Sequence, residues 1–360
     1  MQMDFHYDVV YVLAQLAGFS PEESVKLATS SQYVDDATDS SIVSFNNGCM
    51  YKRISTSHGT FDLRNNDNPA DANYVWAPFH FMPGNDGLPE GTGEGEGYGF
   101  TSRLVCRPDS MVVRDVVREA LAQQGKRYGL HRMGITLHVY ADTWTHQGFA
   151  GIITDRNKIQ NLVLNGAAAL IKKLDNLELD GINQFLPLGH AAVLTYPDLP
   201  YIGEWSFDYL DGRPGVKRNN LDLFLEASNR VFKILTLYKQ GQVPKDAASL
   251  FDNLPDLPPE VLEHFEKCFT NFTGNTRTRH EDWMKEINAH CFDGVEDIPD
   301  YHDEGEGSWE FEALGEEVAD KYTYQPGFLN SDWHLFQDAA SMHRTFVLNE
   351  LLPKYGIAGI

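Results

Sequence analysis

Apolar residues recur at helical spacing from the start of the chain. Residues 4–17 carry apolar side chains three and four positions apart and are followed by Gly18, a pattern that predicts an amphipathic helix. Residues 20–23, Ser-Pro-Glu-Glu, supply an N-cap, a proline at the first helical position and a glutamate three residues after the cap. A second helix is therefore expected to run to about Tyr33, and two adjacent carboxylates, Asp35 and Asp36, follow.

The pattern changes between about residues 40 and 108. Short β-like segments at 41–45 and 50–56 stand near the glycine-rich stretch 88–100, which is typical of a loop. Two short strands are marginally stable alone, so we expect a β/loop elaboration that packs on the helices, and we interpret it as a candidate lid. Helical periodicity then resumes at 109–124, 130–149, 155–177, 219–239, 259–271, 278–290 and 331–354.

These patterns predict a mainly α protein. The 360 residues allow one large domain or two ordinary ones. We expect a single helical domain over residues 1–360, a multi-helix globular body into which the β/loop region 40–108 is inserted. The sequence has no β-α-β alternation and no G-x-G-x-x-G after a strand, which argues against a nucleotide-binding parallel sheet.

The net charge of the chain limits which kinds of molecule it is expected to bind. The chain has 52 Asp and Glu against 29 Lys and Arg, a net charge of −23, so its field repels nucleic-acid backbones and anionic lipid surfaces. General nucleic-acid binding is therefore not expected. A small anionic substrate remains compatible with this charge, because bound divalent cations can make one pocket locally positive.

The N-terminal region lacks the basic and apolar segments of a secretory signal, and no apolar run reaches about 18 residues. We therefore predict a cytoplasmic protein without a transmembrane segment; the sequence gives no indication of oligomeric state. The four cysteines are widely spaced and form no C-x-x-C pair, so neither a disulfide framework nor a thiolate zinc knuckle is indicated. Metal ligands are expected to be His and carboxylates.

The segment 137–151, LHVYADTWTHQGFAG, is apolar except for His138, Asp142 and His146, which recur every four residues. On a helix this spacing places the three side chains along one face, with His131 near the same stripe. Burying these groups without partners would be costly. The pattern therefore predicts either a hydrogen-bonded His/Asp network or a divalent ion such as zinc.

The motif H-x-x-x-D-x-W-x-H at 138–146 resembles the metal-binding helix of the all-helical zinc-dependent phospholipase C and P1 nuclease superfamily. The opening M-D-F-H-Y and the stretch S-Q-Y-V-D-D-A also resemble an uncharacterised bacterial family that shares this text. The resemblance implies a zinc centre of one to three divalent ions that activates water to hydrolyse a phosphate ester. It implies as substrate a small phosphorylated molecule or a phospholipid headgroup.

When the ligands of the superfamily are assigned to this chain by their order in the sequence, the resemblance implies ligands on both sides of the motif. The position four residues after His190 is Leu194 rather than a carboxylate, so Asp198 or Glu204 could take that place. The chain does not begin with the Trp of the secreted phospholipases, and a terminal amine is not expected among the ligands. Asp35 or Asp36 is expected to orient or deprotonate the attacking water. The implied ligands are His6, Asp35 or Asp36, His58, His138, Asp142, His146 and His190.

Other interpretations remain open. The residues at 138–146 could form a buried polar network or a closed structural metal site in a protein without turnover, because a catalytic metal keeps an open coordination position. His190 is also consistent with a packed core histidine. His80 is flanked by aromatic and turn residues, which suits a pocket wall, although packing is the commoner role of such a residue. An HD-type phosphohydrolase also uses helical His and Asp, but the adjacent pair that it needs, His302-Asp303, stands in an acidic stretch typical of a solvated loop.

Overall fold

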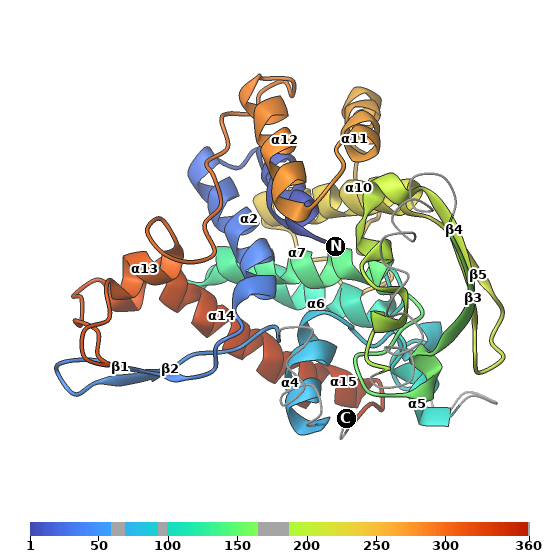
Figure 1. The fold of residues 1–360 in the computed structure, drawn as a ribbon, viewed down its shortest axis with the longest axis horizontal. Helices are drawn as coiled ribbons and strands as arrows, with labels where there is room; N and C mark the ends of the chain where they lie inside the picture. The colour runs from blue at the N-terminus through green and yellow to red at the C-terminus, as the bar shows by residue number, and fades with distance from the viewer. Residues whose placement is uncertain (59–68, 93–98, 165–186, 359–360) are drawn as a thin grey trace.

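Helix α7 (Gly129–Thr145) runs through the centre of the molecule, and the other long helices surround it (Figure 1). Every residue of α7 except Leu130 is buried, as expected for a segment that is apolar on most of its circumference. It packs against α2 (Pro21–Asp36), α6 (Met111–Ala122), α10 (Asn220–Lys239) and α14 (Asp332–Phe346). The motif at 138–146 therefore lies in the middle of the helical core.

The structure is a computed structural model that describes residues 1–58, 69–92, 99–164 and 187–358. About 52% of the described residues are helical, and two small sheets complete this part of the fold. Among the described residues, no helix is both long and apolar enough to span a membrane. The remaining helices are α1 (Val10–Leu16), α4 (Pro69–Phe79), α5 (Gly99–Arg103), α11 (Pro259–Asn271), α12 (Thr276–Asn288), α13 (Trp309–Leu314) and α15 (Leu352–Lys354), with π-helical segments η1 (Asp4–Val9) and η8 (Val347–Leu351).

The N-terminal helices form as predicted. Segment η1 continues into α1, and the chain turns at Gly18, whose φ is +92°. Helix α2 begins with the predicted capping box: Ser20 Oγ accepts from the Glu23 amide at 3.2 Å, and Glu23 Oε2 accepts from the Ser20 amide at 3.0 Å. Because α2 extends to Asp36, the paired carboxylates lie in its last turn beside α7.

Close approach of α2 and α7 depends on Gly134. A Cβ at this position would lie 2.5 Å from Ser30 Cβ and 2.6 Å from the Leu27 carbonyl oxygen. Alanine gains about 1 kcal/mol of helix propensity, whereas overpacking a core costs about 1–3 kcal/mol. We expect Gly134→Ala to lower the free energy of unfolding measured in urea, and to move Asp35 relative to His138. Gly125→Ala is the control, since nothing lies within 4 Å of its Cβ position; equal effects of both substitutions would contradict the packing argument.

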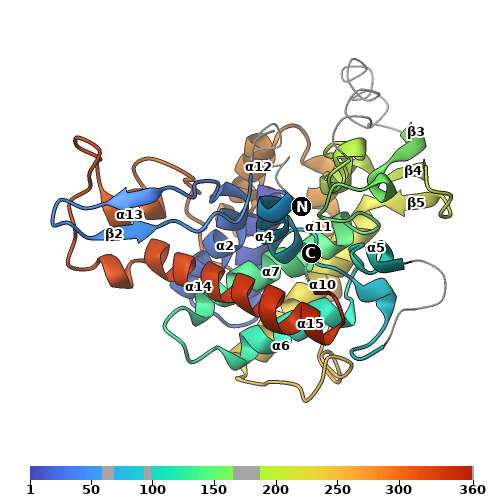
Figure 2. The same cartoon turned by 90° about the horizontal axis from the view of Figure 1, so that it is seen from below.

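The prediction of a helix at 155–177 is wrong over 159–164, where the chain forms β3 (Ile159–Leu164); residues 165–177 lie outside the described residues. This strand pairs antiparallel with β4 (Glu204–Tyr209), which pairs with β5 (Val216–Asn219) in the order β3-β4-β5. The alternation of buried Trp205, Phe207 and Tyr209 with polar neighbours in β4 is a strand pattern that the helical interpretation overlooked. This sheet covers one side of the helical body (Figure 2).

The region 40–108 contains the expected small β element. Strands β1 (Ile42–Ser44) and β2 (Met50–Lys52) form an antiparallel hairpin that extends from the body. The same region also contains helices α4 and α5, which the glycine and proline content had hidden; part of the glycine-rich stretch, 93–98, lies outside the described residues. A separate apolar cluster joins the three-stranded sheet to Phe81 and Phe149, next to the C-terminal end of α7.

Candidate metal centre

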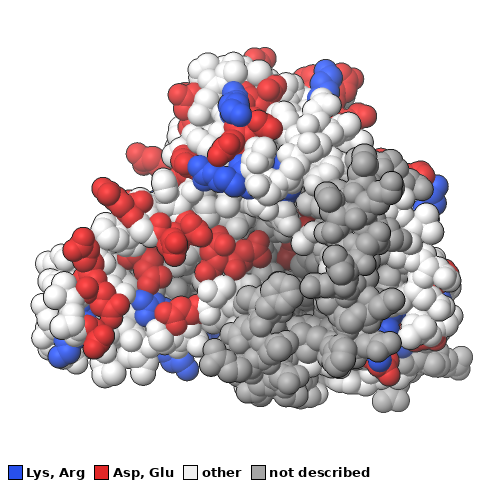
Figure 3. All heavy atoms as spheres, viewed as in Figure 1, with Lys and Arg blue, Asp and Glu red and all other residues white. Residues whose placement is uncertain are grey.

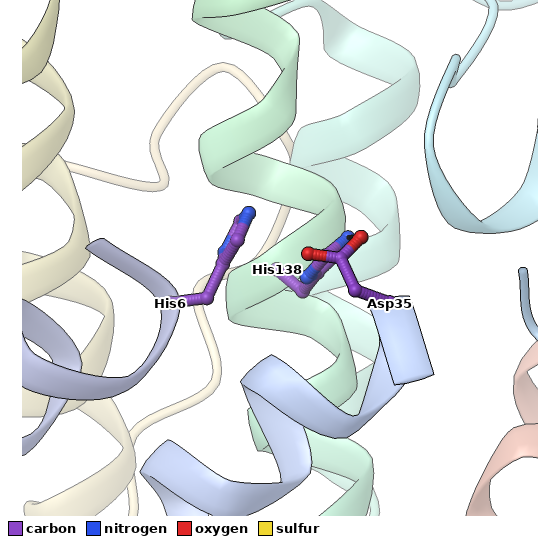
Figure 4. Close-up of side chains that lie close together, drawn as sticks. All are labelled: His6, Asp35 and His138. Carbon is purple, nitrogen blue, oxygen red and sulfur yellow. Dashed lines mark ion pairs between the residues drawn. The ribbon is translucent and has the colours of Figure 1, made fainter. Parts of the chain in front are cut away.

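Three side chains from distant parts of the sequence converge on the centre of α7 (Figure 4). His6 comes from η1, Asp35 from the last turn of α2 and His138 from α7, and one ligand atom of each lies within 4.8 Å of the others. The imidazole rings of His6 and His138 stack with centroids 3.9 Å apart. The π-helical turn of η1 aims His6 at α7, and such turns are frequent at functional sites.

Two further groups of ligand type adjoin the first. His80, at the end of α4, joins His138 and Asp142, and next to them His146 joins His190 and Asp198. His138 Nε2 lies 3.2 Å from both His80 Nδ1 and Asp142 Oδ2. His190 Nε2 lies 3.4 Å from Asp198 Oδ2. The ligand-type residues thus form one continuous cluster along α7 rather than separate sites.

The amino group of Met1 connects the two halves of this cluster. It lies 2.6 Å from Asp142 Oδ1 and 3.1 Å from Asp198 Oδ1, and its own exposed fraction is 0%. Burial opposes its charge, but the two carboxylates outweigh burial and raise the pKa of the amine to about 11. No terminal amine was expected here, because the first residue is Met rather than Trp; the path of η1 nevertheless brings the Met1 amine to Asp142.

Hydrogen bonds at the rim fix which ring nitrogen faces the centre. His138 Nδ1 lies 2.8 Å from the Ser31 carbonyl, His146 Nδ1 2.8 Å from the His80 carbonyl and His190 Nδ1 2.7 Å from the Leu194 carbonyl. His80 Nε2 lies 2.9 Å from the Thr56 carbonyl. A carbonyl only accepts, so each of these nitrogens donates its proton. In a neutral ring, the other nitrogen then presents a lone pair to the cluster, as in metal-binding histidines.

Two of these lone pairs face each other. His80 Nδ1 and His138 Nε2 are 3.2 Å apart, and both rings already donate their opposite nitrogen to a carbonyl. With both rings neutral, these nitrogens are two acceptors that repel at this distance unless a cation lies beside them. In addition, both ring nitrogens of His6 are buried without a hydrogen bond among the described residues, although Nε2 is 3.2 Å from Asp142 Oδ1. A shared cation resolves both features.

Burial sets the protonation of these groups. It lowers the pKa of His6, lowers that of His138 strongly and lowers that of His190 to about 4, so the rings are neutral at neutral pH. Burial opposes ionisation of Asp142, but the charges of His146 and the Met1 amine outweigh it and hold its pKa well below the usual value. Neutral imidazoles and ionised carboxylates are the forms that bind metals.

The structure separates the predicted site residues into two sets. It brings together His6, Asp35, His138, Asp142, His146 and His190. Asp36 faces away from α7, because successive helical residues point about 100° apart, and accepts a hydrogen bond from the Tyr301 hydroxyl at 2.7 Å. His58 is buried outside these groups, with its ring centroid 6.3 Å from that of Trp76.

Two other positions weighed from the sequence also lie elsewhere. His131 is two turns along α7 from His138, too far along the axis to reach the cluster, and its Nε2 lies 3.0 Å from Asp332 Oδ1. Glu204 is on β4, where it pairs with Lys217 at 2.9 Å, so Asp198 is the carboxylate that accompanies His190. His80 and the Met1 amine are the members that the sequence argument did not place in the site.

A cavity of about 390 Å³ lies beside α4, where Tyr74 and Val75 form part of its lining. The Trp76 ring contacts the rings of both His58, which lines the cavity, and His80, which belongs to the cluster. Lys52, Arg53 and Arg344 also line it, which makes it cationic in a strongly acidic protein.

The profile of a family described as "Family of unknown function (DUF6765)" matches residues 1–351. The chain belongs to this family. No curated protein and no solved structure matches it. The DUF6765 match spans every residue of the cluster, but its description names no activity, so a function for this chain has to be argued from the site itself.

The buried histidines give this DUF6765 protein a defined response to acid. Above pH 6.5 His190 is neutral in the folded and unfolded chain; below it, the unfolded chain binds a proton that the folded chain excludes until about pH 4. Stability of the metal-free protein should therefore fall as the pH drops through this window, by roughly 2–3 kcal/mol from His190. Urea unfolding with a chelator at pH 7 and pH 4.5 measures the loss. His190→Gln should reduce it, and an identical loss in the variant would exclude His190 as a source.

Proposed function

We propose that this chain is a metal-dependent hydrolase of a phosphate ester. One to three divalent ions, with zinc as the best match, would be held by His6, Asp35, His80, His138, Asp142, His146, His190 and Asp198. Nitrogen and carboxylate donors without thiolates suit zinc in a catalytic site. The observation that carries the proposal is the pair of lone pairs on His80 Nδ1 and His138 Nε2, 3.2 Å apart.

Divalent ions in such a site polarise phosphoryl oxygens and lower the pKa of a coordinated water. Among the carboxylates of the cluster, Asp35 has the greatest side-chain exposure, 32%, against 1% for Asp142 and 7% for Asp198. Burial of the carboxyl group and the charge of Asp142 raise its pKa well above the usual value, which makes it a better proton acceptor. Asp35 would therefore orient the attacking water and accept its proton.

The cationic cavity supports a phosphorylated substrate. Arg53 is already paired with Glu310, but Arg344 packs over Tyr74 at 5.9 Å and forms no ion pair with any residue that the structure describes. An unpaired guanidinium suits the planar recognition of phosphate. Figure 3 shows acidic side chains gathered from the left to the middle of the face seen in Figure 1. The cavity differs from this surface, because Lys52, Arg53 and Arg344 line it.

The alternative is a non-catalytic site in which the Met1 ammonium serves as the cation. Its ion pairs with Asp142 and Asp198 favour this interpretation, because they already neutralise both carboxylates. Two measurements separate the alternatives: metal content of the purified full chain by mass spectrometry, and hydrolysis of phosphomonoesters, phosphodiesters and phospholipids with added zinc. Stoichiometric metal with turnover of one class supports the hydrolase. Metal without turnover supports a structural site, and protein without metal after zinc loading rules out both metal proposals.

A further inference from the structure

A second group of metal-ligand side chains lies between α11 and α12, outside the centre described above. His264 and Cys268 are four residues apart on α11 and so share a face of that helix. Glu286 on α12 faces them, with its Oε1 2.8 Å from His264 Nε2. One ligand atom of each of the three lies within 4.8 Å of the others, a spread that matches ligands around one tetrahedral ion.

Cys291, a second cysteine, lies next to this group. Helix α12 ends at Asn288, and His290 has a left-handed φ of +56°, which turns the chain back toward the helix. The Cys291 amide then donates to the Glu286 carbonyl at 3.3 Å. Burial and then the Glu286 carboxylate raise the pKa of the Cys291 thiol, and the same two causes raise that of Cys268. The turn therefore brings the second cysteine near Glu286, beside the three-residue group formed by the two helices.

Aromatic side chains pack against one side of this group. The His264 ring packs edge-on against Phe292 at 4.5 Å, and Phe292 stacks with Trp283 at 6.2 Å. His264 Nε2 is buried and makes no hydrogen bond of good geometry, despite its short distance to Glu286. A buried nitrogen in this position, within reach of a thiol and a carboxylate, has neighbours of the kind that bind a metal ion.

We propose that His264, Cys268, Glu286 and Cys291 bind one divalent transition-metal ion, preferentially zinc, as a structural link between α11 and α12. Two thiolates, an imidazole and a carboxylate are borderline-to-soft donors that select zinc over magnesium or calcium. Four protein ligands leave no open position, which distinguishes this site from a catalytic one. Both thiols release their protons to solvent on binding. The site is independent of the proposed hydrolase activity.

The site stabilises a part of the fold that supports the first centre. Helix α12 also carries Arg279 and His280, which pair with Asp4 and Asp8 of η1. Segment η1 in turn positions Met1 and His6. A metal link from α11 to α12 would therefore stabilise the helix on which η1 is anchored, without taking part in chemistry.

Cobalt substitution of the full chain tests this proposal, because thiolate ligands give cobalt(II) an intense charge-transfer absorption in the near ultraviolet. The first centre contains no thiol, so the band reports only the α11–α12 site. We expect the band in the reduced wild-type protein and in His138→Ala, and its loss in Cys268→Ser and Cys291→Ser. Zinc content should fall by one equivalent in both cysteine variants.

Cys49→Ser is the matched control for Cys291→Ser, since both cysteines are exposed. Cys268 is buried, so its variant is interpreted only if its near-ultraviolet circular dichroism is native; otherwise Cys291→Ser decides. Absence of the band in reduced wild-type protein, or a band that survives Cys291→Ser with unchanged zinc content, would overturn the proposal. A Cys268–Cys291 disulfide that persists without metal in reductant would do the same.

Discussion

Replacing Asp142 with Asn is expected to remove metal from the first centre and to abolish hydrolysis. One Asp142 oxygen lies 2.6 Å from the Met1 amine and 3.2 Å from His6 Nε2; the other lies 3.2 Å from His138 Nε2 and 3.4 Å from His80 Nδ1. Asparagine keeps the size of the side chain but loses its charge. Losing only a partner of a metal ligand costs about 10–100-fold in affinity, so removing a central carboxylate should exceed that loss.

The same substitution should lower stability. Met1 and Asp142 are both buried, with exposed fractions of 0% and 1%, and breaking a buried ion pair costs about 3–5 kcal/mol. Asp198, 3.1 Å from the amine, retains part of the compensation, so we expect the lower end of this range. Chelator competition measures metal affinity, steady-state assays measure kcat, and urea unfolding measures stability.

Asp338→Asn is the matched control, because His334 and Asp338 have the same H-x-x-x-D spacing on α14. Asp338 is 29% exposed and pairs with Arg127, which is 52% exposed, so its loss should cost less than about 1 kcal/mol and leave metal binding unchanged. Retention of metal and activity in Asp142→Asn would contradict the proposed centre. An equal loss in both variants would point to a general effect on the fold.

Local signals in the sequence were sufficient to predict the helices around the site. The capping box at Ser20 and the apolar periodicity of 129–145 depend only on neighbouring residues, so α2 and α7 were predictable. Strand β3 was not predictable, because its sequence is compatible with either the helical or the strand periodicity and its partner β4 lies about 40 residues away. In β4 itself, the alternation of Trp205, Phe207 and Tyr209 was a usable signal.

The candidate site was predictable only where its residues share one helix. The spacing of His138, Asp142 and His146 follows from helical geometry alone. His80 carries no such spacing, because it reaches the site through the path of α4, and neither the sequence nor its order along the chain indicates that path. Asp35 and Asp36 are equivalent in sequence; only the rotation of the last turn of α2 decides which one faces α7.

The group of ligand-type residues between α11 and α12 was also not predictable from the sequence alone. A search for C-x-x-C finds none, because Cys268 and Cys291 belong to different elements and approach one another only after the turn at His290. The spacing of His264 and Cys268 on one helix was the available local signal. Metal ligands collected from two helices therefore require the tertiary arrangement before they can be recognised.

Replacing Arg279 with Ala is expected to destabilise the protein by about 3–5 kcal/mol, because it leaves a buried carboxylate without a partner. Arg279 Nε donates to Asp4 Oδ2 at 2.8 Å and Nη2 to Asp4 Oδ1 at 3.3 Å, and both side chains are 1% exposed. Domains are typically stable by only about 5–15 kcal/mol, so this is a large fraction. Because Asp4 belongs to η1, the variant should also bind metal more weakly at the first centre.

Arg277→Ala tests whether burial rather than charge causes this effect. Arg277 is on the same helix and pairs with Asp300 at 2.7 Å, but the two side chains are 49% and 34% exposed. Exposed pairs contribute about 0–1 kcal/mol, so we expect a small loss in urea unfolding and unchanged metal affinity. Equal destabilisation by the two substitutions would contradict the role of the buried pair. A loss of stability in Arg279→Ala with unchanged metal affinity would show that η1 keeps Met1 and His6 in place without α12.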